Sequence, residues 1–127
     1  MTLLDYEVQD HEQMAKEQNC KVVYPRANQL QLDIDSQEAQ DMHLQLLGLF
    51  SADPLRAFSM VNYTATPSKS GLPHRHVTIT LQNDLMDDYE RIMMQALLGS
   101  DRKRELISLR RLLNGEKRVT RFFEPLT

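Results

Sequence analysis

Two short stretches of the chain alternate between apolar and polar residues. In 29–35 the apolar positions are Leu30, Leu32 and Ile34, and in 74–81 they are Val77, Ile79 and Leu81. Successive side chains of a β-strand point to opposite faces, so each stretch predicts a strand with one buried and one polar face. The polar face of the first strand carries Asp33 and Asp35, and that of the second carries His74 and His76.

Apolar residues at helical spacing predict three helices, at 37–50, 85–98 and 101–113. Ser36 can cap the first helix, Asn83 or Asp84 the second and Ser100 the third. We expect two helices to bury the stripes Tyr89, Ile92, Met93, Ala96, Leu97 and Leu106, Leu109, Leu113. Further strands are predicted at 21–24, 58–65 and 119–124, with a loop at 66–73 that contains two prolines and a glycine.

The order of these elements indicates the fold. From residue 29 it is strand, helix, strand, strand, helix, helix, strand, which matches the split β-α-β-β-α-β (ferredoxin-like) arrangement with one extra helix. We therefore predict a single α+β domain over residues 20–127, with a four-stranded antiparallel sheet and helices on one face. An arm or short helix over 1–19 precedes it. Strands 29–35 and 74–81 are expected to be neighbours at the centre of the sheet.

Composition narrows the class of protein. The chain has 127 residues, of which 41% are hydrophobic, so it is long enough for one folded core. Its single cysteine, Cys20, excludes an internal disulfide and a cysteine-based zinc site. It has no long apolar run and no signal-peptide pattern, so we expect a soluble cytoplasmic protein without membrane contact. The net charge is −3, yet the segment 101–121 carries a net charge of +5.

The carboxylates are the first candidates for chemistry. Asp33 and Asp35 share a strand face with Cα atoms roughly 6.5–7 Å apart, and such a pair repels itself unless it binds a cation or a proton. Oxygen ligands suit Mg²⁺ or Mn²⁺. Asp101 opens a helix and is a candidate third carboxylate. The alternative is that the pair only ends a strand and that Asp101 is a favourable charge at a helix N-terminus.

The phosphate-binding candidates are polar or basic. They are Ser68, Lys69 and Ser70 in the loop before Gly71, the histidines His74 and His76, and Arg110 and Arg111 in the basic segment. Together with the carboxylates they indicate metal-assisted phosphoryl transfer on nucleotides. Taken singly, each feature also fits a flexible loop, a surface histidine or a solvated arginine.

Three stretches together resemble the archaeo-eukaryotic primase superfamily. Leu32-Asp33-Ile34-Asp35 is similar to its first motif, and the loop from Ser68 to His76 is similar to its second, although His74 stands where the family has a small residue. Asp101, with Glu105 as a substitute, followed by Arg110 and Arg111, is similar to its third. The chain lacks the family's flanking module and zinc-binding cysteines.

The resemblance implies an RRM-like catalytic core and a primase-polymerase-like nucleotidyltransferase of phage or plasmid DNA replication. It implies Asp33, Asp35, His76 and Asp101 as catalytic residues, of which the three aspartates hold the metal. Nucleoside triphosphates, a single-stranded DNA template and a helicase or another replication protein are the implied partners, in a bacterial or phage-infected cell.

Two other readings stay open. His74-Arg75-His76 is also similar to the His-hydrophobic-His motif of rolling-circle replication endonucleases, with Tyr89 as the candidate nucleophile. Arg75 is not apolar, however, and Tyr89 falls on a stripe expected to be buried. The last reading is a non-catalytic phage accessory protein that binds nucleic acid, although the predicted open face lacks exposed aromatic residues for base stacking.

Overall fold

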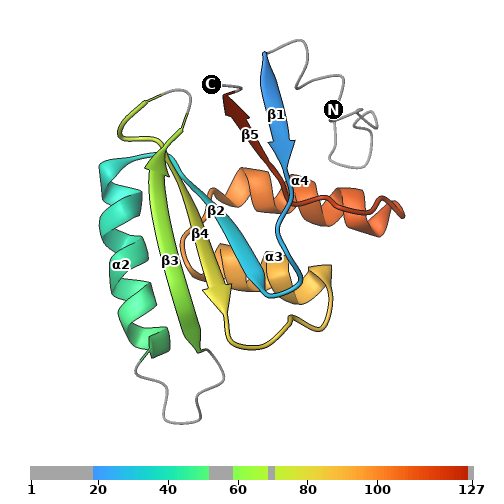
Figure 1. The fold of residues 1–127 in the computed structure, drawn as a ribbon, viewed down its shortest axis with the longest axis horizontal. Coiled ribbons are helices and arrows are strands. Elements are labelled where there is room, and N and C mark those ends of the chain that lie inside the picture. The colour runs from blue at the N-terminus through green and yellow to red at the C-terminus, as the bar shows by residue number, and fades with distance from the viewer. Residues whose placement is uncertain (1–18, 52–58, 69–70, 126–127) are drawn as a thin grey trace.

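The computed structural model describes residues 19–51, 59–68 and 71–125 of the chain. Its elements follow in the order β1 (Cys20–Val23), β2 (Gln29–Ile34), α2 (Gln37–Ser51), β3 (Met60–Pro67), β4 (Arg75–Leu81), α3 (Asp88–Leu97), α4 (Arg102–Leu113) and β5 (Phe122–Pro125) (Figure 1). The arm or helix predicted over 1–19 lies almost wholly outside the described residues.

Strands β2, β4 and β3 form an antiparallel sheet in that order. Within it Asp33 lies opposite His76, and Thr64 lies opposite Thr78. The predicted adjacency of the strands around 29–35 and 74–81 is therefore confirmed, and so is the α+β class. The single four-stranded sheet is not formed, because β5 pairs with β1 in a separate two-stranded antiparallel sheet.

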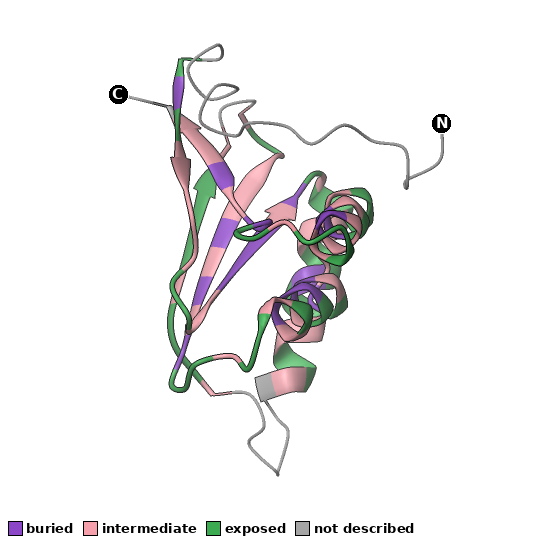
Figure 2. Ribbon diagram, turned by 90° about the vertical axis from the view of Figure 1, so that its right-hand side faces the viewer, coloured by how far each residue is buried: buried purple, intermediate pink, exposed green. Residues whose placement is uncertain are grey.

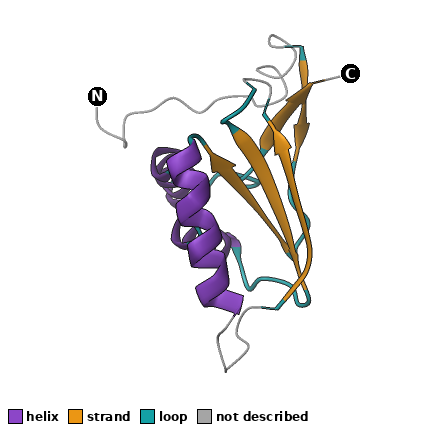
Figure 3. Cartoon of the chain, turned by 90° about the vertical axis from the view of Figure 1, so that its left-hand side faces the viewer, coloured by secondary structure: helices purple, strands orange, loops and turns teal. Residues whose placement is uncertain are grey.

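The sheet packs its apolar face against the helices. Figure 3 shows the helices on one side of the strands, and Figure 2 shows buried positions alternating along the strands. The core consists of the predicted alternating residues of β2 and β4 together with Leu98, and α2 packs Ala39, Leu46, Leu47 and Phe50 against it. Ser36 caps α2 as predicted, since its Oγ accepts a hydrogen bond from the Ala39 N–H at 3.0 Å.

The outer edge of β2 explains why the fourth strand pairs elsewhere. Alternate backbone groups of a strand point to opposite edges, so the N–H and C=O groups of Gln29, Gln31 and Asp33 point away from β4. All six are hydrogen-bonded: the Gln29 N–H donates to the Arg26 carbonyl, and the other five groups bond to the segment that runs from α3 into α4. One of the five is the bond from the Asp101 N–H to the Asp33 carbonyl, at 2.8 Å. No ladder position is left for β5.

Helices α3 and α4 turn polar side chains toward this edge. Gln95 Oε1 accepts from the Gln31 N–H at 2.8 Å, and Arg104 Nη1 donates to the Gln31 carbonyl at 2.6 Å. The buried residues of the two helices are Arg91, Ile92 and Gln95 in α3 and Glu105, Ser108 and Arg111 in α4. Arg91, Gln95 and Ser108 can be buried because each is hydrogen-bonded to a backbone group, and Glu105 because it accepts hydrogen bonds from the side chains of Gln95, Ser100 and Arg104.

The predicted apolar stripes of these two helices were therefore wrong in phase. Ile92 is buried, but Tyr89 is 43% exposed, Met93 62% and Leu97 57%, and Leu106 and Leu113 are also exposed. The predicted caps were wrong as well, because Asp87 caps α3 and Asp101 caps α4. Among the described residues, no helix is long and apolar enough to cross a membrane.

Candidate metal site

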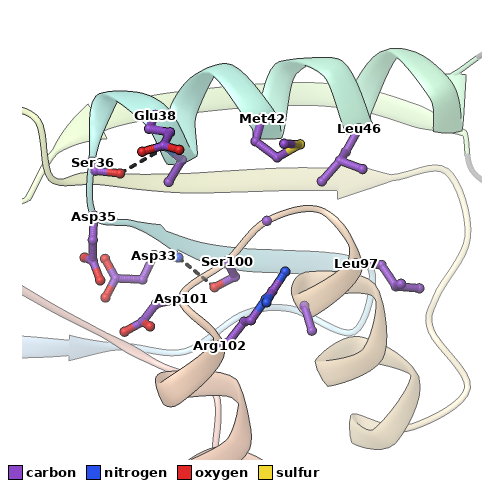
Figure 4. Close-up of a pocket in the computed structure, with 13 residues that line it drawn as sticks. Asp33, Asp35, Ser36, Glu38, Met42, Leu46, Leu97, Ser100, Asp101 and Arg102 are labelled. Carbon is purple, nitrogen blue, oxygen red and sulfur yellow. Dashed lines mark hydrogen bonds between the residues drawn. The ribbon is translucent and has the colours of Figure 1, made fainter.

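Three carboxylates meet at the end of β2. Asp33 is in the strand, Asp35 follows it, and Asp101 is the N-cap of α4; one oxygen of each lies within 4.8 Å of the others (Figure 4). The sequence predicted these three residues as one cluster, and the structure brings them together. Strand periodicity alone accounts for Asp33 and Asp35, and Asp101 is brought to them by the turn between α3 and α4.

Backbone hydrogen bonds fix that turn to the strand. The Asp33 N–H donates to Ser100 Oγ at 3.0 Å, and the Asp101 N–H donates to the Asp33 carbonyl at 2.8 Å. Gly99 supplies the left-handed backbone that the turn needs, with φ +95°. Asp101 Oδ1 accepts from the Lys103 N–H at 3.1 Å, which orients its carboxylate at the start of α4.

The buried carboxylate of Glu105 holds this turn in place. Glu105 Oε2 accepts from Ser100 Oγ at 2.6 Å and from Arg104 Nη1 at 2.7 Å, while its Oε1 accepts from Gln95 Nε2 at 2.8 Å. With both oxygens engaged, Glu105 positions the turn and is not available in this geometry as the substitute for Asp101. Neither Ser100 nor Glu105 was predicted in this role.

The cluster is electrostatically strained. Burial, and after it the neighbouring charge of Asp35, raise the pKa of Asp33 to about 6 against the opposing effect of the Arg104 guanidinium. Burial also raises the pKa of Asp101 above its usual range, and Asp35 adds to the effect. Carboxylates this close favour a bound proton or a bound cation, because either one relieves their repulsion.

A cavity of about 630 Å³ opens beside the carboxylates. The three aspartates and Glu38 line one part of it, and Met42, Leu46 and Leu97 line another, so it lies between the start of α2 and the α3–α4 turn (Figure 4). The volume lies in the range of small-molecule sites. A ligand can therefore approach the carboxylates from this side.

The two predicted histidines differ in environment. His74 Nδ1 lies 3.4 Å from Asp35 Oδ1 at the surface. His76 stacks on Phe122 of β5, with ring centroids 4.1 Å apart, and its Nδ1 lies 3.4 Å from Glu124 Oε1. Its side chain is 12% exposed, and burial lowers its pKa. His76 is thus next to Asp33 in the sheet, as predicted, but it faces β5, and its phosphate role stays a prediction.

The loop before β4 is only partly described. The Ser68 N–H donates to the His74 carbonyl at 2.9 Å, and the Gly71 N–H donates to the Ser68 carbonyl at 2.8 Å. Lys69 and Ser70 lie outside the described residues. The hydrogen bonds tie Ser68 to the strand that leads to His76, so the loop begins close to the end of β2 that carries Asp35.

The predicted arginines do not reach the cluster. Arg110 and Arg111 are in the last turn of α4, about 13 Å along the helix axis from Asp101. The cation that acts on Asp33 is instead Arg104, which sequence reasoning missed. It sits one turn into α4, where its spacing from Asp101 was the only available signal. It also lies over the Phe122 ring, with Cζ 5.2 Å from the centroid.

Tyr89 lies far from both histidines. Two residues further along α3, Arg91 Nε donates to the Gln29 carbonyl at 2.9 Å, which places the start of this helix at the beginning of β2. His76 is opposite Asp33, at the other end of that strand. Tyr89 and the histidines are thus separated by most of the length of β2, about 13 Å.

Comparison of the chain with protein-family models, curated proteins and solved structures found no match. A functional assignment must therefore come from the carboxylate cluster and its surroundings.

Proposed function

We propose that this protein is a divalent-cation-dependent nucleotidyltransferase of the primase-polymerase type. The observation that carries the proposal is the convergence of Asp33, Asp35 and Asp101 from two elements to within 4.8 Å beside an open cavity. All the candidate ligand atoms are carboxylate oxygens, the donors that Mg²⁺ and Mn²⁺ take in nucleotide-handling sites. The repulsion that raises the pKa of Asp33 and Asp101 is the kind that such an ion relieves.

The three aspartates would hold the ion, which would supply charge stabilisation at a transferring phosphoryl group. Neighbouring residues position the three aspartates and adjust their charge. Ser100 and the Asp101 N–H fix the backbone of Asp33. His74 pairs with Asp35 at the rim, and Arg104 moderates the charge of the cluster from inside.

The proposal extends to the cellular role. As partners we propose nucleoside triphosphates, a single-stranded DNA template and a helicase or another replication protein, with phage or plasmid DNA replication in the cytoplasm as the setting. Of the two basic residues at the end of α4, Arg111 is buried, so Arg110 is the candidate for a phosphate contact of the nucleic acid away from the metal, which fits its distance from Asp101.

The rolling-circle endonuclease reading is less well supported. It requires a tyrosine nucleophile and a histidine-bound metal that both contact the same phosphate. Tyr89 and His76 lie near opposite ends of β2, and His76 contacts Phe122 and Glu124. The geometry therefore favours chemistry at the aspartates.

The test is nucleotide incorporation on a single-stranded DNA template with Mn²⁺, resolved on a denaturing gel. We expect extension by the wild-type chain and by Tyr89→Phe, and no extension by Asp35→Asn, because the amide weakens the metal site. A covalent DNA–protein adduct that disappears in Tyr89→Phe would instead establish the rolling-circle reading. If neither product forms and the chain binds DNA in a salt-sensitive way that weakens on loss of Arg110, the protein would be an accessory protein instead.

A further inference from the structure

Strand β3 forms an edge of the three-stranded sheet. It is eight residues long, Met60–Pro67, and its only partner in the described part of the chain is β4 (Figure 1). Seven of the eight residues are exposed, all but Tyr63. The sequence MVNYTATP contains no charged residue, and its one proline is at the end. Lysine, internal proline, shortness and bulges are the usual protections of an edge strand, and of these β3 has only a register irregularity between Met60 and Asn62, at its beginning.

The opposite edge of the same sheet is β2, and its outward backbone groups have partners. On β2, every outward N–H and C=O group of Gln29, Gln31 and Asp33 is hydrogen-bonded, all but one of them to the segment that runs from α3 into α4. The fold thus closes one edge completely and leaves the longer one without a partner among the described residues. An uncharged edge with unpaired backbone groups is suited to pairing with another strand.

Alternation along the sheet shows which groups of β3 point outward. The backbone N–H and C=O groups of Gln29, Gln31 and Asp33 point away from β4. The backbone groups of the residues between and after them in β2 therefore bond to those of Arg75, Val77 and Ile79 of β4. The next residues of β4, His76 and Thr78, then point to β3, where they meet Thr66 and Thr64. The backbone groups of Tyr63 and Ala65 are therefore those directed out of the sheet.

We propose that β3 pairs with β3 of a second copy of this chain, antiparallel about a twofold axis at Thr64. In this register Tyr63 of each copy lies opposite Ala65 of the other, and these are the residues whose N–H and C=O groups point outward. Thr64 meets Thr64, and Asn62 meets Thr66, so polar side chains share the open face. The register is isologous and closes at two copies, forming one continuous six-stranded sheet.

The helix side of the edge adds apolar contact to this interface. Ala65, which shares a face of the strand with Tyr63, is exposed, and Leu44 of α2 is 50% exposed. The neighbouring His43 is hydrogen-bonded through Nε2 to the Tyr63 hydroxyl at 2.9 Å, so this part of α2 lies over β3. A twofold axis at Thr64 brings both copies of this flank to the same side of the joined sheet. Apolar side chains beside a paired edge add buried area to its backbone hydrogen bonds.

The test is disulfide trapping with diamide, which oxidises two thiols to a disulfide and is itself reduced to the hydrazine. Across the axis, a non-hydrogen-bonded pair has Cα atoms about 4.5 Å apart, within disulfide range. We expect Thr64→Cys to give a cross-linked dimer. Thr78→Cys is the matched control on the same face one strand inward, where copies stand about 14 Å apart. The native Cys20 is buried, so the wild-type chain should not cross-link.

Sedimentation equilibrium supplies a measurement without new cysteines. We expect the wild-type mass to rise with concentration toward twice 14.8 kDa. Ala65→Pro, which removes an outward N–H, and Thr64→Lys, which sets two like charges at the axis, should both remain monomeric with an unchanged circular dichroism spectrum. A wild-type chain that stays monomeric at about millimolar concentration, or cross-linking of Thr64→Cys no faster than Thr78→Cys, would overturn the proposal. So would dimerisation that survives Thr64→Lys. None of these outcomes depends on metal binding, so they are separate from the test of the proposed function.

Discussion

At the scale of single residues, the site is defined by Asp33, whose carboxylate is partly buried and lies next to other negative charges. Its backbone is held by Ser100 and Asp101, and its carboxylate is held next to two others. Strand alternation was enough to place Asp33 and Asp35 together, because the side-chain period of a strand is fixed. The same pattern could not reveal Arg104 or Glu105, because their positions depend on how α4 docks against the edge of β2.

The raised pKa of Asp33 predicts how the stability of the folded chain depends on pH. The folded state binds a proton near pH 6 and the unfolded state near 3.8, so without metal the free energy of unfolding should fall as pH rises from about 4 to 6. Asp33→Asn removes this titration. We expect it to be more stable than the wild-type chain at pH 7.5 by about 1 kcal/mol, a value reduced from the full shift because the group is partly exposed.

Urea unfolding in the presence of a chelator at several pH values measures this difference. The two stability curves should converge below about pH 4, where the wild-type carboxyl is protonated in both states. Parallel curves from pH 4.5 to 7.5 would show that Asp33 does not titrate as described. Asp41→Asn, which changes an exposed acid outside the cavity, is the control.

At the scale of elements, α3 and α4 show why apolar periodicity can mislead. Their apolar residues repeat at helical spacing, and this fixed the existence of both helices and their approximate bounds. The faces were wrong, because the edge of β2 requires polar partners, and Gln95, Arg104 and Ser100 satisfy it. The need to satisfy an unpaired strand edge outweighed the burial of Met93 and Leu97, and this need cannot be seen until the topology is known.

Two neighbouring residues of α3 test this orientation. Ile92 is 4% exposed and Met93 is largely exposed. We expect Ile92→Ala to lower the free energy of unfolding by about 2–4 kcal/mol, because it leaves a cavity in the core. Met93→Ala should change it by less than about 0.5 kcal/mol. The two variants are compared by urea unfolding at one pH, and equal losses, or a larger loss for Met93→Ala, would refute the orientation of α3.

At the scale of the whole molecule, the strand order was predictable and the closure of the sheet was not. The alternation in β2 and β4 and the turn residues between the elements indicated an α+β fold with these two strands adjacent, which is confirmed. A four-stranded sheet was wrong, because β5 pairs with β1 and covers His76 with Phe122. Strands β1 and β5 are far apart in the sequence, and local patterns do not indicate which distant strands will pair.

The central claim is that Asp33, Asp35 and Asp101 together bind a divalent cation. The most direct measurement is calorimetric titration of the chain with Mn²⁺ at pH 7.5, for the wild type, Asp33→Ala, Asp35→Asn and the control Asp41→Asn. We predict saturable binding by the wild type and the control, and none by the other two, since two carboxylates do not complete the site. The affinity for Mn²⁺ should also fall about tenfold for each pH unit below pH 6, because Asp33 takes up a proton there. Equal Mn²⁺ affinity in Asp33→Ala and the wild-type chain would contradict the claim.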